Sequence, residues 1–126
     1  MANKNKAKGT RAESRVVKYL ESHGIKARRK ALSGSKDEGD VELPELNCCL
    51  EVKTGKMTAN YSRSQLEEWF EQTSIEEKNS GQPCYLVIVR YRRKIEDAEV
   101  WYPCWTGDKA IFQYLNDWCE QIKKNK

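Results

Sequence analysis

The sequence has a single histidine, His23, and its five cysteines include no Cys-x-x-Cys pair. Structural zinc sites use cysteine or histidine ligands at such short spacings, so we do not expect a fold held together by zinc. Five is an odd number of cysteines, and the N-terminus lacks the charged and then apolar run of a signal peptide. We therefore expect reduced cysteines in a cytoplasmic protein.

Long apolar runs and internal repeats are also missing. No stretch approaches the roughly 20 apolar residues of a membrane span, so we expect no membrane partner. The 126 residues suffice for one domain with a single core. We predict a disordered basic N-terminus over residues 1–8 and one domain over residues 9–126.

Charge is abundant, since 33% of the residues are charged and the formal net charge is +4. The basic residues are clustered, which indicates contact with phosphates, although solvated faces would also explain them. We favour phosphate contact because the second cluster leads directly towards an acidic motif. The clusters are Lys4, Lys6, Lys8 and Arg11; Lys26, Arg28, Arg29 and Lys30; and Arg90, Arg92, Arg93 and Lys94.

Hydrophobic periodicity predicts an α/β fold with the element order α-β-β-β-α-β-β-α. Such an order implies one mixed five-stranded sheet flanked by helices. The expected helices cover residues 10–23, 62–79 and a last segment that begins at residue 106 or 108; the expected strands cover residues 25–32, 39–43, 50–53, 84–91 and 98–102.

The second and third of these strands form a predicted hairpin. Both alternate polar and apolar residues, and residues 44–47 between them contain the proline and asparagine of a short turn. A turn centred on these four residues pairs Leu43 with Cys48 and Val41 with Leu50.

The same register places Asp40 opposite Glu51, with Lys53 on the same face of the pleat. Like charges facing each other at about 5 Å are destabilising. A cation between the two carboxylates would remove this repulsion. Two carboxylates beside one lysine therefore indicate a cation site, as in metal-dependent nucleases. The alternative is a solvent-facing hairpin with an ordinary Glu-Lys pair.

Glu13 is a third candidate carboxylate. It precedes Val16, Val17 and Leu20 by three, four and seven residues, so it shares the apolar stripe of the first helix. A glutamate in that position either completes the acidic site or is stabilised by the helix dipole.

Such a site suits Mg²⁺, with Mn²⁺ as a substitute, because hard cations prefer oxygen ligands. The expected ligands are Asp40, Glu51, the Val52 carbonyl and Glu13. A bound ion would lower the pKa of a water and polarise a scissile phosphate. Lys53 would orient that nucleophile and offset the charge developing on the phosphate.

These segments resemble motifs of the PD-(D/E)XK nuclease superfamily, and within it those of the archaeal and phage Holliday junction resolvases. The resemblance spans residues 8–90, with Gly39 in place of the motif's proline. It implies a restriction-endonuclease-like core and a bacterial, archaeal or phage-infected host cell. The matching pieces are Lys8-Gly9-Thr10-Arg11-Ala12-Glu13, Leu32-Ser33-Gly34-Ser35, Gly39-Asp40-Val41 and Leu50-Glu51-Val52-Lys53.

The resemblance also implies roles for individual residues. Glu13, Asp40, Glu51 and Lys53 fall on the family's catalytic positions, and Ser33 or Ser35 on a loop serine near the scissile phosphate. Gln65 either steadies the lysine or the water, or closes a capping box with Ser62. The expected DNA-binding residues are Arg11, Arg15, Arg28, Arg29, Lys30, Ser33, Ser35, Lys36 and Tyr61, the last of which could equally be a packing residue.

The expected function is therefore that of a Mg²⁺-dependent endonuclease that nicks four-way DNA junctions. Resolution of a junction needs two symmetric sites, which predicts a homodimer formed through residues 101–105 or the outer side of the last helix. Two alternatives remain open: a restriction-like or DNA-repair nuclease of the same fold, and a non-catalytic DNA-binding protein.

Overall fold

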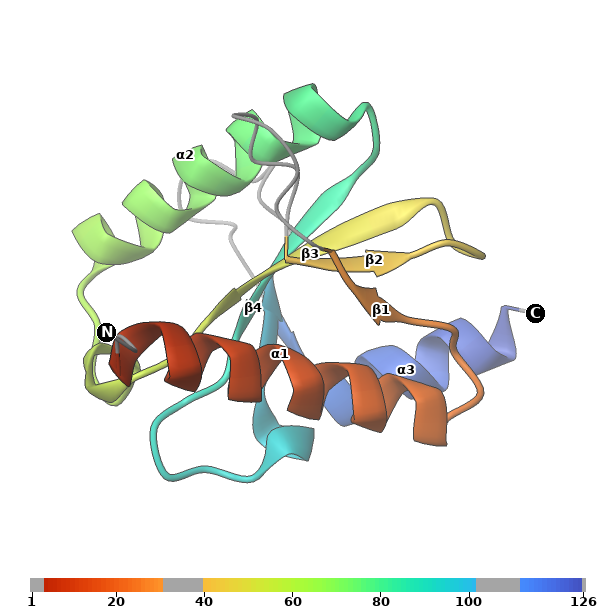
Figure 1. The fold of residues 1–126 in the computed structure, drawn as a ribbon, viewed down its shortest axis with the longest axis horizontal. Coiled ribbons are helices and arrows are strands. Elements are labelled where there is room, and N and C mark those ends of the chain that lie inside the picture. The colour runs from red at the N-terminus through yellow and green to blue at the C-terminus, as the bar shows by residue number, and fades with distance from the viewer. Residues whose placement is uncertain (1–3, 31–39, 102–111, 126) are drawn as a thin grey trace.

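The computed structural model describes residues 4–30, 40–101 and 112–125, with side chains from residue 10 onwards. Within these residues six strands form one sheet, and its strand order follows the chain from β1 to β6. β3 and β4 are parallel, and every other neighbouring pair is antiparallel. Figure 1 shows α1 crossing the front of the sheet and α2 lying above it.

The helices are α1 (Lys4–Ser22), α2 (Arg63–Ser80) and α3 (Leu115–Lys124), with short 3₁₀ turns η1 (Lys56–Thr58) and η2 (Ile95–Asp97). The strands are β1 (Arg28–Arg29), β2 (Val41–Leu43), β3 (Cys48–Lys53), β4 (Cys84–Ile88), β5 (Glu99–Trp101) and β6 (Phe112–Tyr114). None of the described helices is long and apolar enough to cross a membrane.

The sheet separates two apolar clusters. On one face the α1 stripe packs with Leu50, Val87 and residues of α3. On the other face α2 packs against Leu86 and Ile88. Successive residues of β4 thus enter opposite clusters, which explains why this strand is apolar throughout.

Local sequence signals set the ends of the helices. Gly24, in the left-handed conformation at φ 77°, follows α1, and the N–H of Ile25 donates to the carbonyl of Leu20 at 3.0 Å. Ser62 caps α2 by accepting a hydrogen bond from the N–H of Gln65 at 3.1 Å. At the other end of α2, Gly81 adopts φ 71°.

Three predictions about the fold were wrong. The sheet has a sixth strand among the described residues, because Phe112–Tyr114 pairs with β5 instead of starting the last helix. Residues 4–8, expected to be disordered, belong to α1; lysine and alanine favour helix, and no proline interrupts them. The first strand is only two residues long. Residues 106–111 of the expected last helix lie outside the described residues.

Candidate active site

The predicted hairpin has the expected register. Leu43 pairs with Cys48 and Val41 with Leu50. Val41 and Leu50 are the last paired residues of the two strands. Beyond them, the N–H of Asp40 donates to the carbonyl of Leu50 at 2.9 Å. Asp40 therefore lies just before β2, next to the second half of β3.

Main-chain contacts fix the position of the Asp40 carboxyl group. The Oδ2 atom of Asp40 accepts a hydrogen bond from the N–H of Val52 at 2.9 Å. The main-chain carbonyl of Asp40 accepts one from the N–H of Lys30 at 2.9 Å. The carboxyl group is thereby held beside Glu51, the residue that precedes Val52.

Burial and mutual repulsion dominate the electrostatics of this site. The pKa of Asp40 is raised from 3.8 to about 8, first by burial, then by the charge of Glu51 and, more weakly, by that of Glu13. The side chain of Glu51 is only 6% exposed. The buried Oε2 atom of Glu51 has no hydrogen-bond partner among the described residues. A proton shared between the two carboxyl groups relieves their repulsion when no cation is present.

Two cationic side chains border the carboxylates. Lys53 Nζ lies 3.2 Å from Glu51 Oε1. Arg29 donates from Nε to Glu13 Oε1 at 3.3 Å and from Nη2 to Thr10 Oγ1 at 3.4 Å. Burial raises the pKa of Glu13, and Arg29 opposes that rise. Glu13 is thus near enough for its charge to raise the pKa of Asp40, while its own ion-pair partner is Arg29.

The donor set suits a hard cation held largely by water. Among the described residues, no group of three or more histidine, cysteine or acidic side chains is arranged as a ready-made metal cage. The half-buried Asp40 and the buried Glu51 nevertheless offer two neighbouring carboxyl groups, and Glu51 has an oxygen with no hydrogen-bond partner among the described residues. Mg²⁺ binds proteins in this way, through one or two carboxylates and several waters.

Two predicted site residues have roles within the fold. The side chain of Gln65 donates to Glu68 at 3.4 Å, and its N–H donates to the capping hydroxyl of Ser62, so both of these contacts belong to the first turns of α2. The hydroxyl of Tyr61 donates to Glu99, and its ring packs on that of Trp69.

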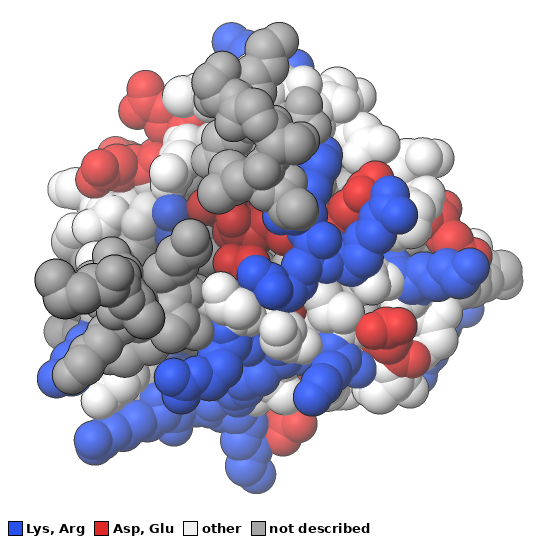
Figure 2. Space-filling model, viewed as in Figure 1, with Lys and Arg blue, Asp and Glu red and all other residues white. Residues whose placement is uncertain are grey.

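Apart from Arg29 and Tyr61, described above, the predicted DNA-binding residues divide into three groups. Arg11 and Arg15 are exposed on α1. Arg28 is exposed on β1 and forms an ion pair with Glu42 at 2.9 Å; Lys30, which follows β1, is partly exposed. Ser33, Ser35 and Lys36 lie outside the described residues. Figure 2 shows acidic atoms near the centre of one face, with basic side chains beside and below them.

A buried polar network around Glu99 was missed from the sequence. Glu99 is 3% exposed and accepts hydrogen bonds from Tyr61, from Arg90 at 3.1 Å and from the Trp101 indole at 3.2 Å. Arg90, expected to contact phosphates, is half-buried, with its side chain 32% exposed and its guanidinium bonded to Glu99. The sequence contained one signal for this network: two charged residues, Arg90 and Glu99, lie at the facing ends of two apolar strands.

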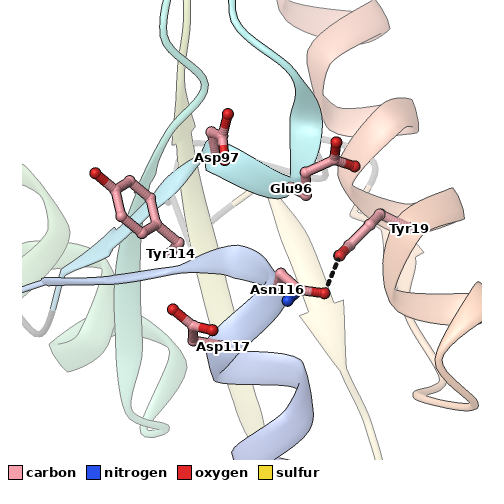
Figure 3. Close-up of a pocket in the computed structure, with 6 residues that line it drawn as sticks. All are labelled: Tyr19, Glu96, Asp97, Tyr114, Asn116 and Asp117. Atoms are coloured by element: carbon pink, nitrogen blue, oxygen red, sulfur yellow. Dashed lines mark hydrogen bonds between the residues drawn. The ribbon is translucent and has the colours of Figure 1, made fainter.

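A separate pocket of about 360 Å³ lies between α1, η2, β6 and α3 (Figure 3). None of the predicted site residues lines it. Its acidic lining makes it unsuited to a phosphate ligand. The lining residues are Tyr19, Glu96, Asp97, Tyr114, Asn116 and Asp117, and the Tyr19 hydroxyl donates to Asn116 at 2.8 Å.

Comparison with known proteins identifies the fold. No protein-family model and no curated protein sequence matches the chain. Among solved structures, it is similar to Hjc, a Holliday junction resolvase from the archaeal hyperthermophile Archaeoglobus fulgidus, with a TM-score of 0.54 and 19% sequence identity. The similarity covers 86% of this chain and 89% of the resolvase. The expected resemblance is confirmed at the level of the fold: the chain shares the architecture of an archaeal Holliday junction resolvase.

Proposed function

We propose that the protein is a metal-dependent endonuclease that nicks four-way DNA junctions. The observation that carries the proposal is the mutually repulsive pair of half-buried Asp40 and buried Glu51 beside Lys53. A fold gains nothing from such a pair unless a cation binds there, because the repulsion raises the free energy of the folded state. The similarity to a junction resolvase supports the choice of DNA as substrate.

Asp40, Glu51 and the carbonyl of Val52 would hold Mg²⁺, or Mn²⁺ in its place, and Glu13 would complete the acidic surroundings. Bound there, the ion would lower the pKa of a water and polarise the scissile phosphate. The chain itself contributes orientation. The N–H of Val52 fixes one oxygen of Asp40 and leaves the other for the ion.

Lys53 is the residue that offsets charge on the substrate. Its ammonium group lies against Glu51, and its side chain is 21% exposed, so it reaches both the carboxylate and an incoming phosphate. A preorganised cation in this position stabilises the additional negative charge of the transition state. It also positions the attacking water.

The substrate would be recognised by shape and by its phosphates. Among the described residues the helices α1, α2 and α3 all pack on the sheet, which leaves no separate helix to read bases in the major groove. Arg29 lies 3.3 Å from Glu13, and it and the other exposed arginines of α1 and β1 would contact the DNA backbone.

Symmetric nicking of a junction needs two sites, so we propose a homodimer as the active form. The sequence had indicated residues 101–105 as one candidate interface. Trp101 is buried against Phe70 and Phe112, and it is therefore part of the core of one chain. Residues 102–105 lie outside the described residues. Sedimentation at micromolar concentration would measure the stoichiometry.

The test of the function uses a labelled four-way junction and a linear duplex of the same sequence, each with and without Mg²⁺. We expect paired nicks in the junction that require the metal ion. Glu51→Gln should abolish nicking while binding persists, because the substitution keeps the shape of the side chain and removes its charge. Preferential cutting of linear duplex would favour a general repair nuclease, and binding without cutting would favour a non-catalytic DNA-binding protein.

A further inference from the structure

The turn that follows β4 exposes three consecutive cationic residues. Arg92, Arg93 and Lys94 are all exposed, and none forms an ion pair with a described residue. The N–H of Arg93 donates to the carbonyl of Arg90 at 3.1 Å, which closes the turn. Three uncompensated charges on one short turn repel one another unless an anion lies against them.

The base of this turn is rigid. Arg90 is held by Glu99 at 3.1 Å and donates to the main-chain carbonyls of Thr58 at 3.2 Å and Ala59 at 2.7 Å. The N–H of Tyr91 donates to the hydroxyl of Thr58 at 2.9 Å. The three exposed cations are therefore presented on a fixed platform, which reduces the entropy lost when they bind a partner.

Arg92 has an unusual backbone conformation for its residue type. Its φ is 59°, in the left-handed region where glycine or asparagine is usually found. Its guanidinium lies over the ring of Tyr91, 5.1 Å from the centroid. Stacking of this kind orients the plane of the guanidinium and leaves its N–H groups available for a phosphate.

The turn lies at the same end of the sheet as the candidate active site. The N–H of Val89 donates to the carbonyl of Lys53 at 2.9 Å. Arg92 follows Val89 by three residues, so the Cα atom of Arg92 lies at most about 11 Å from the Cα atom of Val89. The cluster of Arg28, Arg29 and Lys30 lies on the other side of β3, across β2.

We propose that Arg92, Arg93 and Lys94 bind the phosphate backbone of the DNA on the β4 side of the scissile phosphate. This proposal deepens the proposed function and rests on it for the identity of the ligand. The two basic clusters then contact DNA on both sides of the acidic site. Because the contacts are to phosphates, they add affinity and salt dependence without sequence preference.

The experiment compares two triple-alanine variants in the full chain. One replaces Arg92, Arg93 and Lys94. The matched control replaces Lys78, Lys123 and Lys124, which are also exposed but lie away from the Lys53 end of the sheet. Dissociation constants for a four-way junction are measured without Mg²⁺ over a series of salt concentrations. We expect the first variant to reduce the slope of log K against log salt by about 2 to 3 units, and the control to leave it nearly unchanged.

Arg92→Gly separates DNA contact from a structural role. Glycine relieves the left-handed strain, so this variant should be at least as stable as the parent in thermal unfolding. It should nevertheless bind the junction more weakly, with a slope reduced by about 1 unit. Unchanged binding by Arg92→Gly, or equal effects of the two triple variants, would overturn the proposal.

The outcome for the parent protein keeps the two proposals distinct. A parent that nicks junctions with Mg²⁺, together with an unchanged salt slope in the first triple variant, refutes the binding surface and leaves the nuclease function standing. A parent that binds but does not nick, together with a reduced slope, refutes the nuclease function and supports the surface. A parent that binds no DNA refutes both.

Discussion

Replacing Asp40 with asparagine should stabilise the metal-free protein while abolishing cleavage. The Asp40 carboxyl group is half-buried beside Glu51, and its pKa is raised from 3.8 to about 8. Asparagine is similar in size and keeps an oxygen that can accept the hydrogen bond from Val52. The substitution removes the electrostatic repulsion and little else.

The sign of the pH dependence follows from the raised pKa. The folded chain binds the Asp40 proton more tightly than the unfolded chain does. The free energy of unfolding of the metal-free protein therefore falls as the pH rises from about 4 to about 8, and it is level above that range.

At 1.36 kcal/mol per pKa unit, the full shift evaluated at pH 7 corresponds to about 4 kcal/mol. Local relaxation of the Asp40–Glu51 pair reduces this value. We expect Asp40→Asn to gain about 1 to 3 kcal/mol at pH 7 and to lose most of the pH dependence.

Thermal unfolding in EDTA between pH 4.5 and 8.5 would measure both effects. A gain of that size raises the melting temperature of a domain of this length by roughly 3 to 10 °C. Glu42→Gln is the matched control, because Arg28 lowers the pKa of Glu42 and this substitution removes a favourable charge. If Asp40→Asn is less stable than the parent at pH 7 in EDTA, the repulsive-pair model is wrong.

Added Mg²⁺ should cancel or reverse the difference in stability between the two proteins. A ligand that binds only the folded state stabilises it by about 2.7 kcal/mol at 100 times its dissociation constant. The parent should show this increase, and Asp40→Asn should show almost none because a ligand has been lost. Equal stabilisation of both proteins by Mg²⁺ would place the ion elsewhere.

Three further predictions concern neighbouring parts of the structure. Lys53→Ala should reduce nicking by about 100-fold or more while Mg²⁺ still raises the melting temperature, and loss of that thermal shift would contradict a purely electrostatic role. Alanine in place of Arg28, Arg29 and Lys30 should reduce the slope of log K against log salt for junction binding by up to about 3 units. An unchanged slope would mean that these residues are solvated and do not contact the DNA. Glu99→Gln should destabilise the fold by about 1 to 3 kcal/mol in urea unfolding, because it weakens three hydrogen bonds in a buried network.

The hairpin register was predictable because local rules determine it. A two-residue period and a turn with proline and asparagine leave one arrangement that puts Val41 and Leu50 on the same buried face. The cap at Ser62 and the stop at Gly24 follow from equally local chemistry. The sixth strand was not predictable in this way, because Phe112 and Tyr114 have to meet β5 before strand pairing is better than helix.

The burial of Glu51 is the part of the site that local rules do not supply. Alternation along β3 places Glu51 on the face opposite Leu50, and a half-buried hairpin would leave that face in water. In the folded chain the strand partner of Glu51 is Leu86, which packs in the cluster formed with α2. Water is thereby excluded from Glu51, and the same docking buries Glu99 on the same face of the sheet. One tertiary contact thus converts an ordinary pair of acidic residues into two carboxyl groups that a bound cation would stabilise.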